Sequence, residues 1–221
     1  MRPCAIAVIV IGIVFQYFFI FRAKTSKAEL SFKTLASACF VIAGLLACLQ
    51  IGGTVALLVF FGLVCGLFGD FFLHYRFINK SKIILLIGVF FFLVGHILYI
   101  IAMFFTGAKW YVGVIVAVLG LPALAKYIFS HDVDFGKLVY LGTTYMAILL
   151  FFTGMSLGYL LAKPSLYSAV FLIGSVFFLF SDTMWCLNNF CKTPKKIYRT
   201  ACLVSYYFAQ NLFVISLLLT R

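Results

Sequence analysis

The chain has 221 residues, of which 66% are hydrophobic and only 10% are charged. This small number of charged side chains cannot cover the surface of a soluble domain of this size. The composition therefore excludes a soluble protein and predicts a membrane protein whose surface is covered by lipid. The formal charge of +12 does not indicate nucleic-acid binding, because the Lys and Arg residues lie in short gaps between apolar runs, where lipid headgroups would meet them.

Eight apolar runs follow one another along the chain, each long enough to cross a bilayer as a helix. Gly52 and Gly53 break the chain between the second run and the third. The runs cover residues 4–21, 34–50, 55–75, 83–105, 111–129, 138–161, 167–190 and 200–220. We therefore predict an all-α polytopic membrane protein with eight transmembrane helices in one bundle, in which residues 1–221 form a single membrane-embedded domain.

The basic residues differ in number between the two ends of these helices. When each Lys and Arg is assigned to the nearer helix end, thirteen fall on the side of the first, third, fifth and seventh loops, and four fall on the other side. Lys33, just before the second predicted helix, is one of the thirteen. The positive-inside rule makes this side cytoplasmic, so we predict an integral multi-pass protein with both termini on the non-cytoplasmic side.

Three further patterns are interpreted as structural. The seven cysteines contain no CxxC pair, so we expect no disulfide framework, no metal site and no other cofactor. Gly154-Met155-Ser156-Leu157-Gly158 matches the G-x-S-x-G pattern of serine hydrolases, but it lies within an apolar helix, where its glycines favour helix packing. His131-Asp132-Val133-Asp134 is more typical of a solvated turn than of a metal site.

Two of the five acidic residues, Asp70 and Asp182, lie inside predicted helices, whereas Glu29, Asp132 and Asp134 fall in predicted loops. A carboxylate in hydrocarbon costs about 2.5 to 3.5 kcal/mol on insertion scales, so it usually faces a bundle interior or a wet cavity and has a function there. The alternative is a structural hydrogen-bonded pair, or a residue near a helix end that reaches the interface.

Other polar residues accompany these aspartates. Gly62, Gly66, Asp70 and His74 are four residues apart and form one helix stripe, and Ser175, Asp182 and Asn189 repeat every seven residues on another helix. Further polar side chains are Ser181, His96, Tyr99, Tyr206, Tyr207, Gln210 and Asn211. Asp70, Asp182, His96 and Gln210 all fall between the cytoplasmic surface and the midplane, which predicts a polar cavity open to the cytoplasmic leaflet.

Four short motifs lie in the third, fourth, seventh and eighth predicted helices. They are Gly69-Asp70-Phe71-Phe72-Leu73, Gly95-His96-Ile97-Leu98-Tyr99, Ser181-Asp182 and Tyr206-Tyr207-Phe208-Ala209-Gln210-Asn211. In this order they resemble the YhhN family of membrane lysoplasmalogenases, over nearly the whole chain. The resemblance implies hydrolysis of the vinyl ether bond of a lysoplasmalogen, which gives a fatty aldehyde and glycerophospho-ethanolamine or glycerophospho-choline.

The chemistry of this cleavage suits two carboxyl groups. An acid protonates a carbon of the vinyl ether and water attacks the oxocarbenium-like centre that results, so one carboxyl must be protonated and the other ionised. We predict that Asp70 and Asp182 form this catalytic pair, and the acid is left unassigned. The residues predicted to position substrate or water are His74, His96, Tyr99, Ser181, Asn189, Tyr207, Gln210 and Asn211.

The expected partners are a lysophospholipid substrate and the surrounding membrane lipids, with a homodimer left open and no nucleic acid expected. The alternative function is a small transporter, in which the same two aspartates carry protons or coordinate a cation. Aldehyde release by the purified protein would favour the enzyme. Transport in liposomes without any chemistry would favour the transporter.

Overall fold

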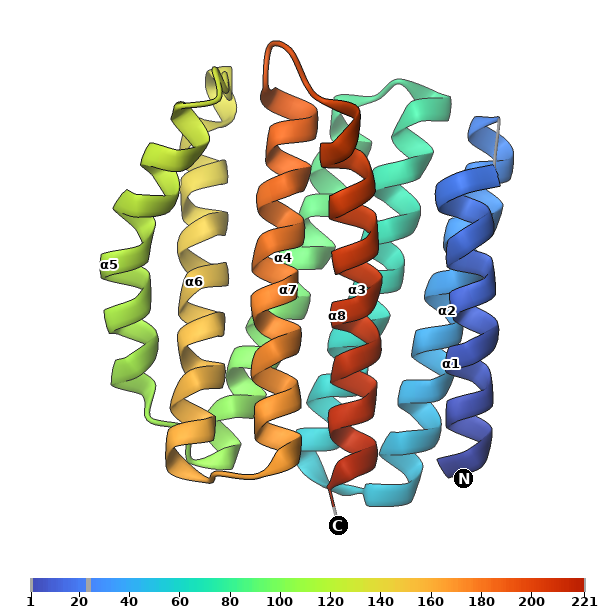
Figure 1. The fold of residues 1–221 in the computed structure, drawn as a ribbon, viewed down its shortest axis with the longest axis vertical. Coiled ribbons are helices and arrows are strands. Elements are labelled where there is room, and N and C mark those ends of the chain that lie inside the picture. Colours follow the sequence, from blue (N-terminus) through green and yellow to red (C-terminus); the bar gives the residue numbers. More distant parts are fainter. Residues whose placement is uncertain (1, 23–24, 221) are drawn as a thin grey trace. The chain divides into compact units, whose positions relative to one another are not determined.

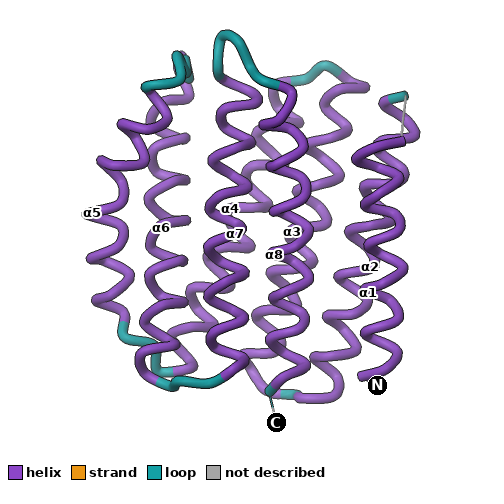
Figure 2. Tube along the Cα trace, in the orientation of Figure 1, coloured by secondary structure: helices purple, strands orange, loops and turns teal. Residues whose placement is uncertain are grey.

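The structure is a computed structural model that describes residues 2–22 and 25–220, and in this part of the chain eight helices are long and apolar enough to cross a membrane (Figure 1). They are α1 (Arg2–Tyr17), which continues through the π-helical turn Phe18–Arg22, α2 (Ser26–Ile51), α3 (Gly53–Asn79), α4 (Lys82–Thr106), α5 (Trp110–Phe129), α6 (Val139–Ala162), α7 (Leu166–Phe190) and α8 (Lys196–Leu219). Short loops join them (Figure 2). The predicted all-α polytopic membrane fold is therefore confirmed.

Helix α2 begins at Ser26, whereas the sequence predicted a start at residue 34. The side chain of Thr25 accepts a hydrogen bond from the Ala28 amide at 3.2 Å, which caps the helix, and Glu29 lies in its first turn, where an acidic residue is favourable. The prediction that placed Glu29 and Lys33 in a loop was wrong, because a search for apolar runs excludes helical turns that carry charged side chains.

The predicted break between the second and third helices is confirmed. Gly52 and Gly53 have φ angles of 70° and 83°, which glycine adopts more readily than other residues. The Gly52 amide donates to the Cys48 carbonyl at 2.8 Å, which ends α2, and α3 starts at the next residue.

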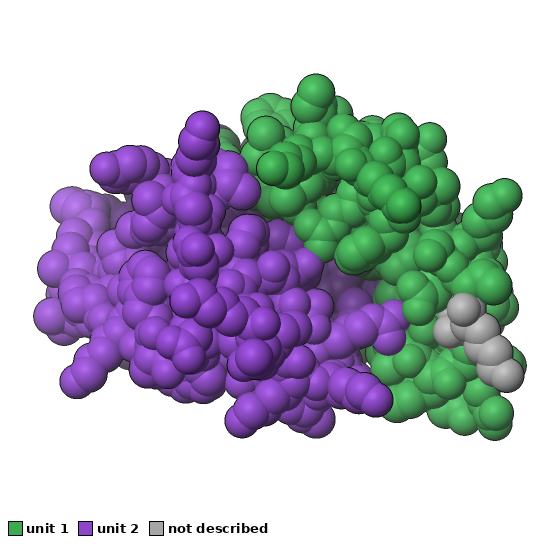
Figure 3. Space-filling view, turned by 90° about the horizontal axis from the view of Figure 1, so that it is seen from above, with its two compact units in different colours: residues 1–102, 214–221 green, residues 103–213 purple. Residues whose placement is uncertain are grey.

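The helices fall into two compact units, residues 1–102 with 214–221 and residues 103–213, which Figure 3 colours separately. In the first unit α2 packs against α1 and α3. Glycines on α3 allow α4 to approach closely: a Cβ atom at Gly69 would lie 2.7 Å from the Phe92 ring, and one at Gly62 would overlap the Tyr99 ring. These contacts place the polar side chains of α3 on a buried face.

In the second unit α6 packs against α5 and α7. A Cβ atom at Gly154 would lie 2.7 Å from the Gly113 Cα atom, so α5 and α6 meet at their glycines. Phe152, Phe171 and Phe213 form an aromatic cluster, with the last two ring centroids 4.9 Å apart. This apolar packing holds α7 between α6 and the part of α8 that belongs to the unit.

Candidate functional site

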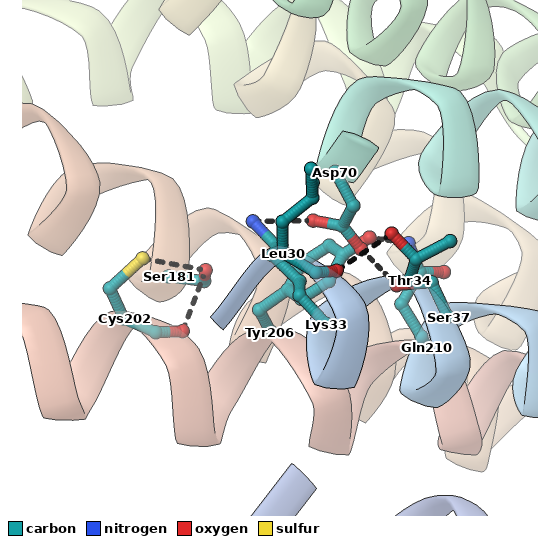
Figure 4. Close-up of polar contacts among 9 residues, drawn as sticks. All are labelled: Leu30, Lys33, Thr34, Ser37, Asp70, Ser181, Cys202, Tyr206 and Gln210. Atoms are coloured by element: carbon teal, nitrogen blue, oxygen red, sulfur yellow. Dashed lines mark hydrogen bonds and ion pairs between the residues drawn. The ribbon is translucent and has the colours of Figure 1, made fainter. Parts of the chain in front are cut away.

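The Asp70 carboxylate on α3 is buried, with 1% of the residue exposed, and both of its oxygen atoms contact side chains of α2. The Lys33 ammonium lies 2.9 Å from Oδ1, and the Ser37 hydroxyl donates a hydrogen bond of 2.6 Å to Oδ2 (Figure 4). Lys33 and Ser37 are four residues apart, so one face of α2 presents both groups to the same carboxylate.

A second contact between an acidic side chain and a basic one lies one helical turn away. Glu29 precedes Lys33 by four residues on α2, and His74 follows Asp70 by four residues on α3. The Glu29 carboxylate lies 3.2 Å from Nε2 of His74. The exposed fraction of the side chain rises from 2% at Asp70 to 25% at Glu29, so the polar column of Glu29, Lys33, Ser37, Asp70 and His74 runs from a buried to a partly exposed position.

The ring of Phe19 covers this polar column. Phe19 is 1% exposed and lies in the π-helical turn Phe18–Arg22 that follows α1. Its centroid is 5.9 Å from the Lys33 ammonium and 5.7 Å from the imidazole of His74. An aromatic face at this distance favours the positive charge of Lys33 and excludes water from the pair.

His96 and Tyr99, two of the predicted positioning residues, belong to α4 in the same unit. Each is 2% exposed. Tyr99 packs against Gly62 of α3. A Cβ atom at Gly95, the residue before His96, would lie 3.2 Å from the carbonyl oxygen of Gly62. The Gly62-Gly66-Asp70-His74 stripe therefore allows α4 to approach at one end and meets the polar side chains of α2 at the other.

Asp182 lies on α7 in the second unit and is partly buried. The Tyr145 hydroxyl, from α6, donates a hydrogen bond to its Oδ2 atom. Tyr145 was not among the sequence-predicted residues. A tyrosine within an apolar helix is inconspicuous in sequence, and its partner lies 37 residues away.

The other predicted residues of the second unit are buried or hydrogen-bonded. Ser181 donates to the Cys202 carbonyl at 3.0 Å, and the Gln210 amide donates to the Tyr206 hydroxyl at 3.0 Å (Figure 4). Asn189 donates to the carbonyl of Trp185 on its own helix at 2.7 Å. Tyr207 and Asn211 are 1% and 8% exposed. Ser181 thus links α7 to α8, and Gln210 is oriented by Tyr206.

The sequence model of the YhhN family matches residues 28–217, which is most of the chain and includes Lys33, Asp70 and Asp182. The chain belongs to the YhhN family. No curated protein and no solved structure matches it.

In this YhhN protein Asp70 and His74 meet polar residues of α2, and Asp182 meets Tyr145, whereas the direct pairing of Asp70 with Asp182 stays a prediction. Sequence reasoning missed Glu29, Lys33, Ser37 and Tyr145. The signal for the first three was present: Glu29, Lys33 and Ser37 are spaced by four residues and lead without interruption into an apolar helix. A helix-period search that tolerated charged residues would have found them.

The G-x-S-x-G segment of the YhhN chain lies inside α6 and has no strand-to-helix turn. Ser156 is completely buried, and its hydroxyl donates to the Phe152 carbonyl of its own helix at 3.0 Å. Gly158 approaches the backbone of Lys109, where an added Cβ atom would lie 3.1 Å from the carbonyl carbon. The segment packs helices, as predicted, and its serine hydroxyl is bound within its own helix.

The His131-Asp132-Val133-Asp134 loop is joined to the loop after α7 by backbone contacts. Val133 and Cys191 form an isolated bridge, and the Asp134 amide donates to the Phe190 carbonyl at 3.0 Å. The Cys191 thiol donates to the carbonyl of His131. These bonds connect the loop that follows α5 to the loop that follows α7.

Proposed function

We propose that this YhhN protein is a membrane hydrolase that cleaves the vinyl ether bond of lysoplasmalogens, with Asp70 and Asp182 as its acid–base pair. The observation that supports this most is the family match over residues 28–217, which contains both membrane-embedded aspartates. Family membership indicates a lysoplasmalogenase-like membrane protein. The vinyl ether substrate and the roles of the two aspartates are the proposal.

The reaction adds one molecule of water across the double bond. One carboxyl donates its proton to the outer carbon of the vinyl ether, and the carbon bound to oxygen becomes an oxocarbenium-like cation. Water attacks this cation and gives up a proton to the other carboxylate. The resulting hemiacetal then splits into aldehyde and alcohol: the second carboxyl returns its proton to the leaving oxygen, and the first takes the hydroxyl proton. Both groups end in their starting states.

We propose further that the substrate reaches the site from the cytoplasmic leaflet. Asp70 precedes the end of α3 at Asn79 by nine residues, and Asp182 precedes the end of α7 at Phe190 by eight, which corresponds to about 14 and 12 Å along a helix. In the predicted orientation both ends are cytoplasmic. The vinyl ether of a lysolipid lies just beneath its headgroup, at a similar depth.

The test is a panel of lysolipids that differ only at the first glycerol carbon, carrying a vinyl ether, an alkyl ether or an ester. Purified protein should release a free aldehyde from the vinyl ether alone, as measured by mass spectrometry of the products. The double variant Asp70→Asn/Asp182→Asn, purified in the same way, controls for a contaminating activity. Absence of aldehyde, together with proton or cation transport in liposomes, would replace the hydrolase with the transporter alternative.

A further inference from the structure

Lys33 is a charged residue of the polar column to which the proposed function gives no role. It lies within the membrane-spanning helix α2, with only 10% of its side chain exposed. A buried ammonium in a membrane is unfavourable unless a negative charge or strong acceptors meet it. The Asp70 carboxylate meets this requirement for Lys33.

We propose that Lys33 is a positioning residue that keeps Asp70 ionised, so that Asp70 is the base of the hydrolysis and Asp182 is the acid. This rests on the proposed function, which requires one carboxylate and one carboxylic acid but does not say which is which. The ion pair between Lys33 and Asp70 distinguishes them.

The hydrogen-bonding chemistry of the two donors supports this assignment. A lysine ammonium can only donate, so the Lys33 contact of 2.9 Å requires an acceptor at Oδ1 of Asp70. The Ser37 hydroxyl donates to Oδ2 at 2.6 Å, so each carboxylate oxygen faces a donor. A proton on Oδ1 would oppose the ammonium, which cannot accept it, whereas the Ser37 hydroxyl can donate or accept; the Lys33 contact therefore carries the assignment.

The surroundings strengthen the attraction between the charges. Asp70 is 1% exposed, and the Phe19 ring lies 5.9 Å from the Lys33 ammonium, so little water screens the pair. A buried ammonium is stabilised by a direct contact with an anionic partner, so the position of Lys33 against Oδ1 favours the carboxylate form of Asp70.

The assignment fixes the direction of each proton transfer. The proton of Asp182 forms the new C–H bond at the outer carbon of the vinyl ether. Asp70 accepts a proton from the attacking water as the C–O bond of the hemiacetal forms, and it returns that proton to the glycerol oxygen as the hemiacetal splits. Lys33 exchanges no proton in this cycle, and its charge limits how firmly Asp70 retains the one it receives.

Labelling with dicyclohexylcarbodiimide tests the assignment without relying on activity, because this apolar reagent adds to protonated carboxyl groups within membranes. Wild-type protein in detergent micelles is treated with the reagent, and peptides containing Asp70 and Asp182 are quantified by mass spectrometry. We expect labelling of Asp182 with a parallel loss of aldehyde release, and labelling of Asp70 at least about tenfold slower.

Three variants separate charge from packing. Lys33→Met keeps the length of the side chain but removes the charge, and should raise the labelling rate of Asp70 and lower aldehyde release by about tenfold or more each. Lys33→Arg keeps the charge and should restore both values toward wild type, which a purely structural contact would not require. Ser37→Ala removes one neutral donor and should raise the labelling of Asp70 only a few-fold.

Two results would overturn the proposal: rapid labelling of Asp70 in the wild-type protein, or wild-type labelling and rate in Lys33→Met. If Lys33→Met does not fold, as judged by gel filtration in detergent, the wild-type protein decides alone: Asp70 labelled more slowly than Asp182 supports the proposal, and Asp70 labelled as fast as Asp182 overturns it. Labelled Asp70 in an enzyme that releases aldehyde would overturn the assignment and leave the hydrolase standing. The expected labelling without aldehyde from any lysolipid would overturn the hydrolase and the base role with it.

Discussion

The two aspartates that stand out in the sequence have different immediate neighbours. Asp70 is almost fully buried and is bound by an ammonium and a hydroxyl of α2, whereas Asp182 is partly buried and accepts a hydrogen bond from a phenol of α6. Substitution of each by Asn preserves size and removes the proton chemistry. The consequences for stability should differ, because Asp70→Asn removes the negative charge that neutralises the buried ammonium of Lys33.

We expect Asp70→Asn and Asp182→Asn each to lower aldehyde release at least about a hundredfold, the usual contribution of a general acid or base. Asp70→Asn should also destabilise the protein by about 3–5 kcal/mol, because it leaves the buried Lys33 ammonium without its counter-ion. Activity is measured by mass spectrometry and stability by thermal unfolding in detergent. Asp132→Asn, in a loop with a φ angle of 52° that Asn tolerates, is the matched control and should change neither. An Asn variant with the wild-type rate would remove that aspartate from the mechanism.

Tyr145→Phe should lower aldehyde release by about tenfold, because the variant removes the hydroxyl that orients Asp182 and keeps the ring. A hydrogen bond between neutral groups contributes about 0.5–1.5 kcal/mol, and the upper end of this range corresponds to about a tenfold change in rate. Tyr140→Phe is the control on the same helix, since 84% of Tyr140 is exposed. Equal rates for the two variants would show that Asp182 does not need Tyr145.

At the scale of the helices, hydropathy predicts which segments span the membrane, but it does not predict which side chains contact one another between helices. An apolar run of about 20 residues has to be helical in a bilayer, so eight runs predict eight helices, and a charge inside such a run is conspicuous. Asp70 and Asp182 were found for this reason. Lys33 and Ser37 were missed as site residues because α2 extends beyond its apolar run, and Tyr145 was missed because only the packing of α6 on α7 brings it to Asp182.

The contact between α3 and α4 gives a prediction of its own. Any side chain at Gly62 overlaps the ring of Tyr99, so Gly62→Val should separate the two helices and destabilise the protein by about 1–3 kcal/mol, as overpacking usually does. Aldehyde release should fall with it, since Tyr99 is a predicted positioning residue on α4. Thermal unfolding in detergent measures the first effect. The control is Leu57→Val, at an exposed position of α3, which should unfold at the wild-type temperature.

For the molecule as a whole, the position of Lys33 bears on orientation. Lys33 is neutralised by Asp70 inside α2, so its charge does not belong to the cytoplasmic loops with which the sequence grouped it. Removing Lys33 from the thirteen leaves twelve basic residues against four on the other side. The difference remains large, and the predicted orientation is unchanged.

Two matched substitutions test this orientation. Thr54→Cys lies next to the glycine break between α2 and α3, and Thr193→Cys lies in the loop between α7 and α8; both positions are exposed. With Cys4 and Cys191 replaced by Ser, a membrane-impermeant maleimide should label position 54 in intact cells and position 193 only after permeabilisation, because the five helices α3 to α7 separate these loops and an odd number of spans places them on opposite sides. The reverse pattern would move the ends of α3 and α7, and the substrate entry proposed there, to the outer leaflet.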